Sequence, residues 1–107
     1  MKIPTEYQIF AQTTRVLFSD TLIDKNDAIG EMHYRTNEIY LHANSNAVNR
    51  PEKEIEQAFF HELIHDILNK LHEYKLRDNE KFVDTFAYAL HQALTTAIVG
   101  KEKFLKD

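Results

Sequence analysis

The spacing of apolar residues changes at about residue 51 of this 107-residue chain, and this change limits the possible folds more than any other feature. Before it, short runs of aromatic and β-branched residues alternate with polar segments, a pattern that favours strands. The runs are residues 7–11, 14–18, 28–34 and 38–42. Residues 35–37 suit a hairpin turn and residues 24–27 a polar loop. We therefore expect a small N-terminal sheet of about four strands, antiparallel or mixed.

After residue 51 the apolar residues recur every three to four positions, as in helices that bury one face. Pro51 followed by Glu52 is typical of a helix start, and this first helix should run to about Leu71. A second helix should begin after Asp78, acting as its N-cap, and end before Gly100. Its expected core residues are Phe82, Phe86 and Leu90. The expected fold class is α+β, a sheet followed by two packed helices.

The composition narrows the classes of function that the chain can have. It contains no cysteine, so any zinc must be bound by His, Asp or Glu rather than by thiolates. The 13 basic and 17 acidic residues are interleaved, and no basic surface indicates nucleic acid. No apolar segment suits a signal peptide or a membrane span, so we expect a cytoplasmic protein. Residues 1–107 are expected to form a single domain, with no pattern that predicts its oligomeric state.

The first predicted helix contains His61-Glu62-Leu63-Ile64-His65, an H-E-x-x-H motif. Residues four apart lie one above the other on one helix face, so both imidazoles can reach the same metal ion. Glu62, beside His61, can reach a metal-bound water as a general base. Ala58, one turn before the motif, leaves room at this face. The motif therefore predicts two zinc ligands, His61 and His65, and a catalytic Glu62.

A catalytic zinc commonly has three protein ligands, and Glu80 is the best candidate for the third. It is a carboxylate in the first turn of the second helix, on the side expected to face the first helix. Asp84, one turn later, suits an outer role in which it accepts the second N–H of a ligand histidine. His72 and His91 are weaker candidates, because each lies too far along its helix.

Together these residues resemble the gluzincins, zinc peptidases with H-E-x-x-H on one helix and a glutamate ligand on the next. Residues 80–84 resemble the E-x-x-x-D element of that family. Residues 79–87 also look like the second helix of small bacterial and phage metallopeptidase-like proteins, similar to the ImmA/IrrE group. The resemblance implies a minimal zincin-like domain that cleaves proteins or peptides. It also implies that residues 38–42 form an edge strand that aligns an extended substrate.

The chain departs from that family in three respects. Asp66 places a charge directly after the second histidine, and we expect it to be solvated or to lie close around the site. The chain is short for a peptidase. The residue that would hold the oxyanion is open among five candidates: Tyr34, Tyr40, His42, Tyr88 and His91.

These observations support three hypotheses about function. The first is a zinc metalloendopeptidase in which Glu62 activates water on zinc. The second is a non-catalytic binding or regulatory module that is stabilised by zinc, because a metal supplies much of the folding energy in small domains. The third is an interaction domain without metal.

Overall fold

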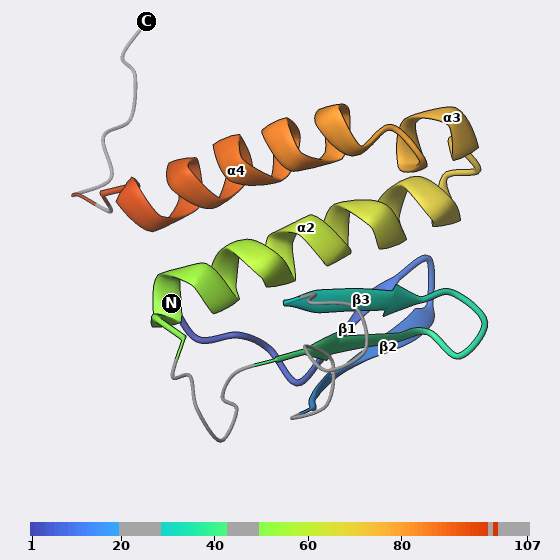
Figure 1. Ribbon diagram of the computed structural model, residues 1–107, viewed down its shortest axis with the longest axis horizontal. Helices are drawn as coiled ribbons and strands as arrows, with labels where there is room; N and C mark the ends of the chain where they lie inside the picture. Colours follow the sequence, from blue (N-terminus) through green and yellow to red (C-terminus); the bar gives the residue numbers. More distant parts are fainter. Residues whose placement is uncertain (20–28, 43–49, 99, 101–107) are drawn as a thin grey trace, which may run out of the picture.

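The computed structural model describes residues 1–19, 29–42, 50–98 and 100 (Figure 1). It confirms the α+β fold class, with a four-stranded sheet followed by helices. The polar loop expected at residues 24–27 lies outside the described residues. Across the described part of the chain, every helix is too short or too polar to span a bilayer.

The sheet is mixed, with the strand order β1-β2-β4-β3. Its strands are β1 (Glu6–Ile9), β2 (Gln12–Phe18), β3 (Gly30–His33) and β4 (Glu38–Leu41). β4 pairs in parallel with β2 and antiparallel with β3, so it lies inside the sheet. The expectation that residues 38–42 form an edge strand is therefore wrong. In the described part of the chain, the strand at that edge of the sheet is β3.

Two tight turns set the register of the hairpins. Residues 34–37 form the predicted turn between β3 and β4, with Asn37 at a φ of 53°. The first hairpin turns at Phe10 and Ala11, with φ values of 52° and 65°. Positive φ at both positions matches the right-handed twist of a two-residue hairpin. The first predicted strand therefore ends at Ile9 and not at residue 11.

The helices are α2 (Glu52–Lys70), α3 (Tyr74–Arg77) and α4 (Glu80–Thr96). α2 lies between the sheet and α4, so the molecule has three layers (Figure 1). The short α3 was not predicted, because four residues are too few to show a helical repeat. α2 therefore has to bury two sides, one against the strands and one against α4. Its buried apolar residues are Phe59, Phe60, Ile64 and Leu68.

α2 ends in a turn whose left-handed residue is His72, with a φ of 60°. The His72 N–H donates to the Asn69 carbonyl at 3.0 Å, and the Glu73 N–H donates to the Leu68 carbonyl at 2.9 Å. This is the Schellman arrangement, which satisfies carbonyls that the helix end leaves without partners. His72 is exposed there and plays no part in the histidine face of α2.

The N-cap of α4 is Asn79, whose side chain accepts a hydrogen bond from the Phe82 N–H at 3.0 Å. The predicted cap, Asp78, instead ends α3 and pairs with Arg77. Since Asp78 and Asn79 are adjacent and both suit a cap, the sequence alone could not separate them.

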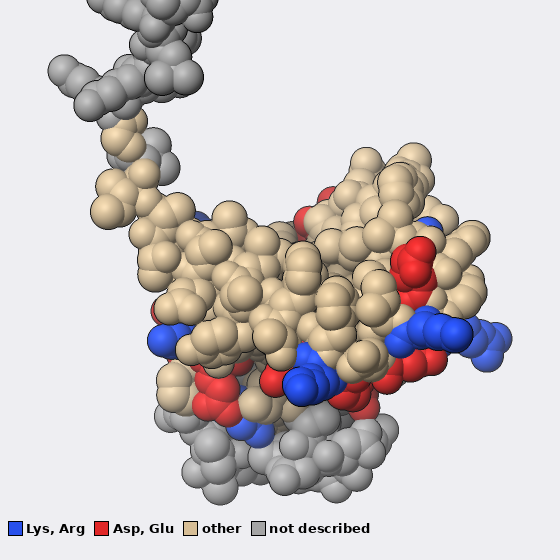
Figure 2. Space-filling view, turned by 90° about the horizontal axis from the view of Figure 1, so that it is seen from above, with Lys and Arg blue, Asp and Glu red and all other residues tan. Residues whose placement is uncertain are grey.

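α4 buries a different face from the one that its large apolar residues predicted. Val83, Ala87 and His91 are buried, four residues apart, whereas Phe86 is 49% exposed. Phe82 and Leu90 are partly buried against the core. Figure 2, which looks down on α4, shows mainly uncharged side chains toward the viewer. The prediction that Phe86 is a core residue is therefore wrong.

Asp66 is fully buried, and the expectation that it is solvated or lies close around the motif is wrong. Its carboxylate accepts hydrogen bonds from the hydroxyls of Tyr7 at 2.6 Å and Thr14 at 2.8 Å. It also pairs with the buried ammonium of Lys70, one turn later on α2. Burial and the Asp66 carboxylate raise the pKa of the Tyr7 hydroxyl. Asp66 thus attaches α2 to β1 and β2.

Candidate metal centre

The motif histidines lie on α2 where it meets the start of α4. His61 and His65 are one turn apart, and their Nε2 atoms are 3.2 Å from each other. One oxygen of Glu80 lies 3.1 Å from Nε2 of His61, and the other lies 3.2 Å from Nε2 of His65. The structure thus brings together the three residues that were predicted as ligands.

The donor atoms fit a tetrahedral zinc site by number, type and spacing. One atom from each residue lies within 4.8 Å of the other two. Two nitrogen ligands at ordinary Zn–N distances are about 3.3–3.4 Å apart across a tetrahedral angle. The observed separations of 3.1–3.2 Å are close to that value. The three residues would leave the fourth position to water or substrate, as in catalytic zinc sites.

The two histidines have the environments that metal binding needs. Burial lowers the pKa of His65, which favours the neutral imidazole that can bind a metal; Glu80 opposes this effect. The Nδ1 atom of His61 lies 3.4 Å from Oδ1 of Asp84. A proton on that nitrogen would face the nearby carboxylate and would leave the Nε2 lone pair for a metal. Asp84 therefore lies where the sequence placed it, beside a candidate ligand.

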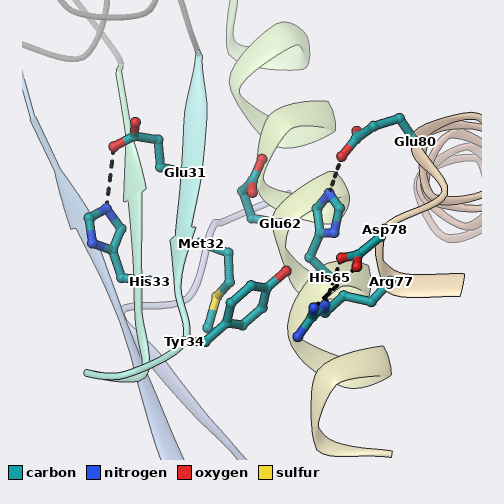
Figure 3. Close-up of a pocket in the computed structure, with 9 residues that line it drawn as sticks. All are labelled: Glu31, Met32, His33, Tyr34, Glu62, His65, Arg77, Asp78 and Glu80. Carbon is teal, nitrogen blue, oxygen red and sulfur yellow. Dashed lines mark hydrogen bonds and ion pairs between the residues drawn. The ribbon is translucent and has the colours of Figure 1, made fainter. Parts of the chain in front are cut away.

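Glu62 is 8% exposed and projects from α2 toward β3 (Figure 3). Within the described part of the chain, it forms neither a hydrogen bond nor an ion pair. Burial, together with the smaller effect of the negative charges of Glu80 and Glu31, raises the pKa of its carboxyl to about 8. A cation held by the histidines and Glu80 would reverse this balance and favour the carboxylate.

Two open clefts flank Glu62, and both include it in their walls. One of about 450 Å³ extends along β3 toward α3, between Met32, Tyr34, His65 and Arg77. The other, of about 410 Å³, extends toward the start of α2 past Ile29, Gly30, Ala58 and His61. The donor cluster of His61, His65 and Glu80 therefore lies where the two clefts meet along β3.

Of the five candidates for holding an oxyanion, Tyr34 is the one placed in these clefts (Figure 3). Burial raises the pKa of its hydroxyl to about 12, against the opposing charge of Arg77. The other four lie elsewhere: Tyr40 donates to Glu38, His42 accepts from Arg50, His91 pairs with Glu56, and Tyr88 is exposed on α4.

Sequence reasoning missed Arg77 and Asp78 as residues of the cleft. The Arg77 guanidinium lies 5.0 Å from the centre of the Tyr34 ring and 4.8 Å from that of Tyr74. It donates to Asp78 at 2.9 Å and to Asn69 at 2.7 Å. A residue in the connection between two helices carries no periodic signal, so only the folded chain shows its place beside Tyr34.

Comparison with known proteins found no matching family model, no similar curated protein and no similar solved structure. The gluzincin resemblance therefore stays a prediction that depends on the residues themselves.

Proposed function

We propose that this protein is a zinc-dependent peptidase of the gluzincin type, in which Glu62 acts as the general base. The observation that carries the proposal is the position of Glu62. It is a buried carboxyl that has no partner among the described residues, and it stands beside the His61, His65 and Glu80 donor cluster. A buried polar group without a partner destabilises the fold, so its presence in an open cleft indicates a functional role.

Each residue then has a defined task. His61, His65 and Glu80 would hold zinc, which lowers the pKa of a bound water and polarises a carbonyl. Glu62 accepts a proton from the attacking water and passes it to the leaving amine. Tyr34 lies across the cleft from His65 and can donate its hydroxyl hydrogen to the developing oxyanion. Asp84, whose Oδ1 lies 3.4 Å from Nδ1 of His61, would favour the tautomer that leaves Nε2 for the metal.

β3 replaces residues 38–42 as the strand that would align the substrate. In the described part of the chain it pairs with β4 on one side only. Ile29 and Gly30 line one cleft, and residues 31–34 line the other. An extended peptide can add to such an edge through main-chain hydrogen bonds. Because one cleft lies on each side of Glu62, a bound peptide would extend past the site in both directions. This arrangement favours an endopeptidase.

The alternative is a non-catalytic module in which zinc joins α4 to α2. One observation favours it: within the described residues α4 contributes only Val83, Ala87 and His91 to the buried interior. A metal bound between the helices would add stability to this small contact.

Replacing Glu62 with Gln separates the two functions. The peptidase account expects the wild type to cleave a chemically unfolded protein and a mixed peptide library. Glu62→Gln should lower that rate about 10²- to 10⁴-fold with an unchanged zinc content. Glu73→Gln, at an exposed position outside the clefts, is the matched control and should keep full activity. A wild type that holds one zinc per chain and cleaves neither substrate would favour the module.

A further inference from the structure

Gly30 lies on β3 directly opposite Glu62. A Cβ atom built on Gly30 would lie 3.1 Å from Cγ of Glu62 and 3.3 Å from its Oε2. It would also lie 3.3 Å from Cδ2 of Leu41, which is fully buried. These distances are shorter than ordinary van der Waals contacts, so the absence of a side chain at Gly30 creates the space that Glu62 occupies.

Of the two neighbours, Glu62 is the one that can move. Leu41 is at 0% exposure in the packed core, where shifts of side chains cost free energy. Glu62 has open cleft on either side. A methyl group at position 30 would therefore displace the Glu62 carboxyl by a few tenths of an ångström.

Glycine is a costly choice for this strand. A glycine in a strand loses more backbone entropy on folding than other residues and contributes no side-chain packing. Its backbone at position 30 is not in the left-handed region that would require glycine. The close approach of Glu62 is thus the structural reason for a glycine here.

We propose that Gly30 is a positioning residue for the general base. Resting on the proposed peptidase function, this inference assigns Gly30 the task of letting the Glu62 carboxyl sit against the β3 backbone, between the two clefts. Gly30 has no side chain with which to bind zinc or substrate, so it would act only through the position of Glu62.

The test compares Gly30→Ala with Gly100→Ala, because a Cβ at Gly100 meets no described atom within 4 Å. Gly30→Ala should lower kcat about 3- to 10-fold with little change in KM, since small misplacements of a catalytic group are costly. Zinc affinity should be unchanged, and the melting temperature should change little, because the lower entropy of the unfolded chain offsets the close contact with Leu41. Gly100→Ala should match the wild type in kcat.

Two results would overturn the inference. One is a Gly30→Ala kcat equal to that of Gly100→Ala. The other is a loss of kcat that accompanies an equal loss of zinc or of folding, as a purely structural glycine would give. A wild type without activity would instead overturn the proposed function. Crystal structures of the wild type and Gly30→Ala would then test the positioning role. A displaced Glu62 carboxyl in Gly30→Ala would support it, and an unchanged position would overturn it.

Discussion

Nε2 of His61 lies 3.1 Å from Oε2 of Glu80, although the two residues are 19 positions apart in the sequence. His61 is in the middle of α2 and Glu80 is the first residue of α4, so the contact joins the two helices. The turn at His72 and the short α3 return the chain to α2 and bring Glu80 to the histidines. The candidate metal centre therefore depends on the connection as much as on the motif.

Asp84 should strengthen zinc binding through His61 without touching the metal. Losing a carboxylate behind a ligand histidine commonly costs 10- to 100-fold in affinity. Asp84 is well exposed, so we expect Asp84→Asn to lie near the lower end, at about tenfold. Competition with a coloured chelator measures this, with Glu73→Gln as the control for lost charge. Equal affinities in both variants would contradict the role of Asp84.

The buried Asp66 and Lys70 pair should stabilise the fold but not the zinc site. Asp66→Ala leaves a buried ammonium without its partner, which we expect to cost about 3–5 kcal/mol of unfolding free energy. Combining it with Lys70→Met should recover much of that loss, because no buried charge then lacks a partner. Urea unfolding of the metal-free proteins measures both. The prediction fails if Asp66→Ala costs less than about 1 kcal/mol.

The buried face of α4 can be tested with a matched pair of substitutions. Val83 is fully buried, so Val83→Ala should cost roughly 2 kcal/mol for the lost methyl groups and the cavity. Phe86 is 49% exposed, so Phe86→Gln should cost about 1 kcal/mol or less, despite removing a larger side chain. Thermal unfolding of the two variants shows which substitution costs more stability. The reverse order would show that Phe86, as its position in the apolar repeat suggested, faces the core.

The Glu56 and His91 pair predicts how stability depends on pH. His91 lies 2.9 Å from Glu56 and lowers the pKa of that carboxyl, against the opposing effect of burial. The folded state then binds the proton less tightly than the unfolded state. The pair therefore contributes stability above the ordinary carboxyl pKa, near 4.5, and loses it as the pH falls further. Unfolding free energies from pH 7 to 3 should fall less steeply for Glu56→Gln than for the exposed control Glu52→Gln. If the unfolding free energy falls equally steeply with pH in both variants, the Glu56 and His91 pair does not contribute the predicted stability.

Local patterns predicted the fold class, the four strands and the spacing of His61 and His65 correctly. These features depend on residues close in sequence, where periods of two and of about 3.6 are informative. Glu80 was predicted from its position at a helix start, and the structure places it beside the histidines. Whether these residues bind zinc stays a prediction.

The errors concern contacts between distant segments. The apolar repeat could not show which side of α4 meets α2, because the small Val83 and Ala87 and the paired His91 form the closer contact. Asp66 looked solvated because its partners Tyr7 and Thr14 come from strands more than 50 residues earlier. Among the described strands, the order that places β3 rather than β4 at one edge of the sheet follows from a parallel pairing that no local pattern encodes.

Zinc titration of the metal-free wild type and Glu80→Gln is the most direct test of whether the histidines and Glu80 bind zinc. We predict one zinc per wild-type chain and a loss of affinity in Glu80→Gln that exceeds the tenfold expected for Asp84→Asn. Glu73→Gln should bind zinc like the wild type. A reconstituted wild type that retains no zinc would contradict a metal site here, because the histidines and Glu80 would then form only a hydrogen-bonded cluster. Zinc binding by Glu80→Gln that is as tight as in the wild type would equally contradict the role of Glu80 as a ligand.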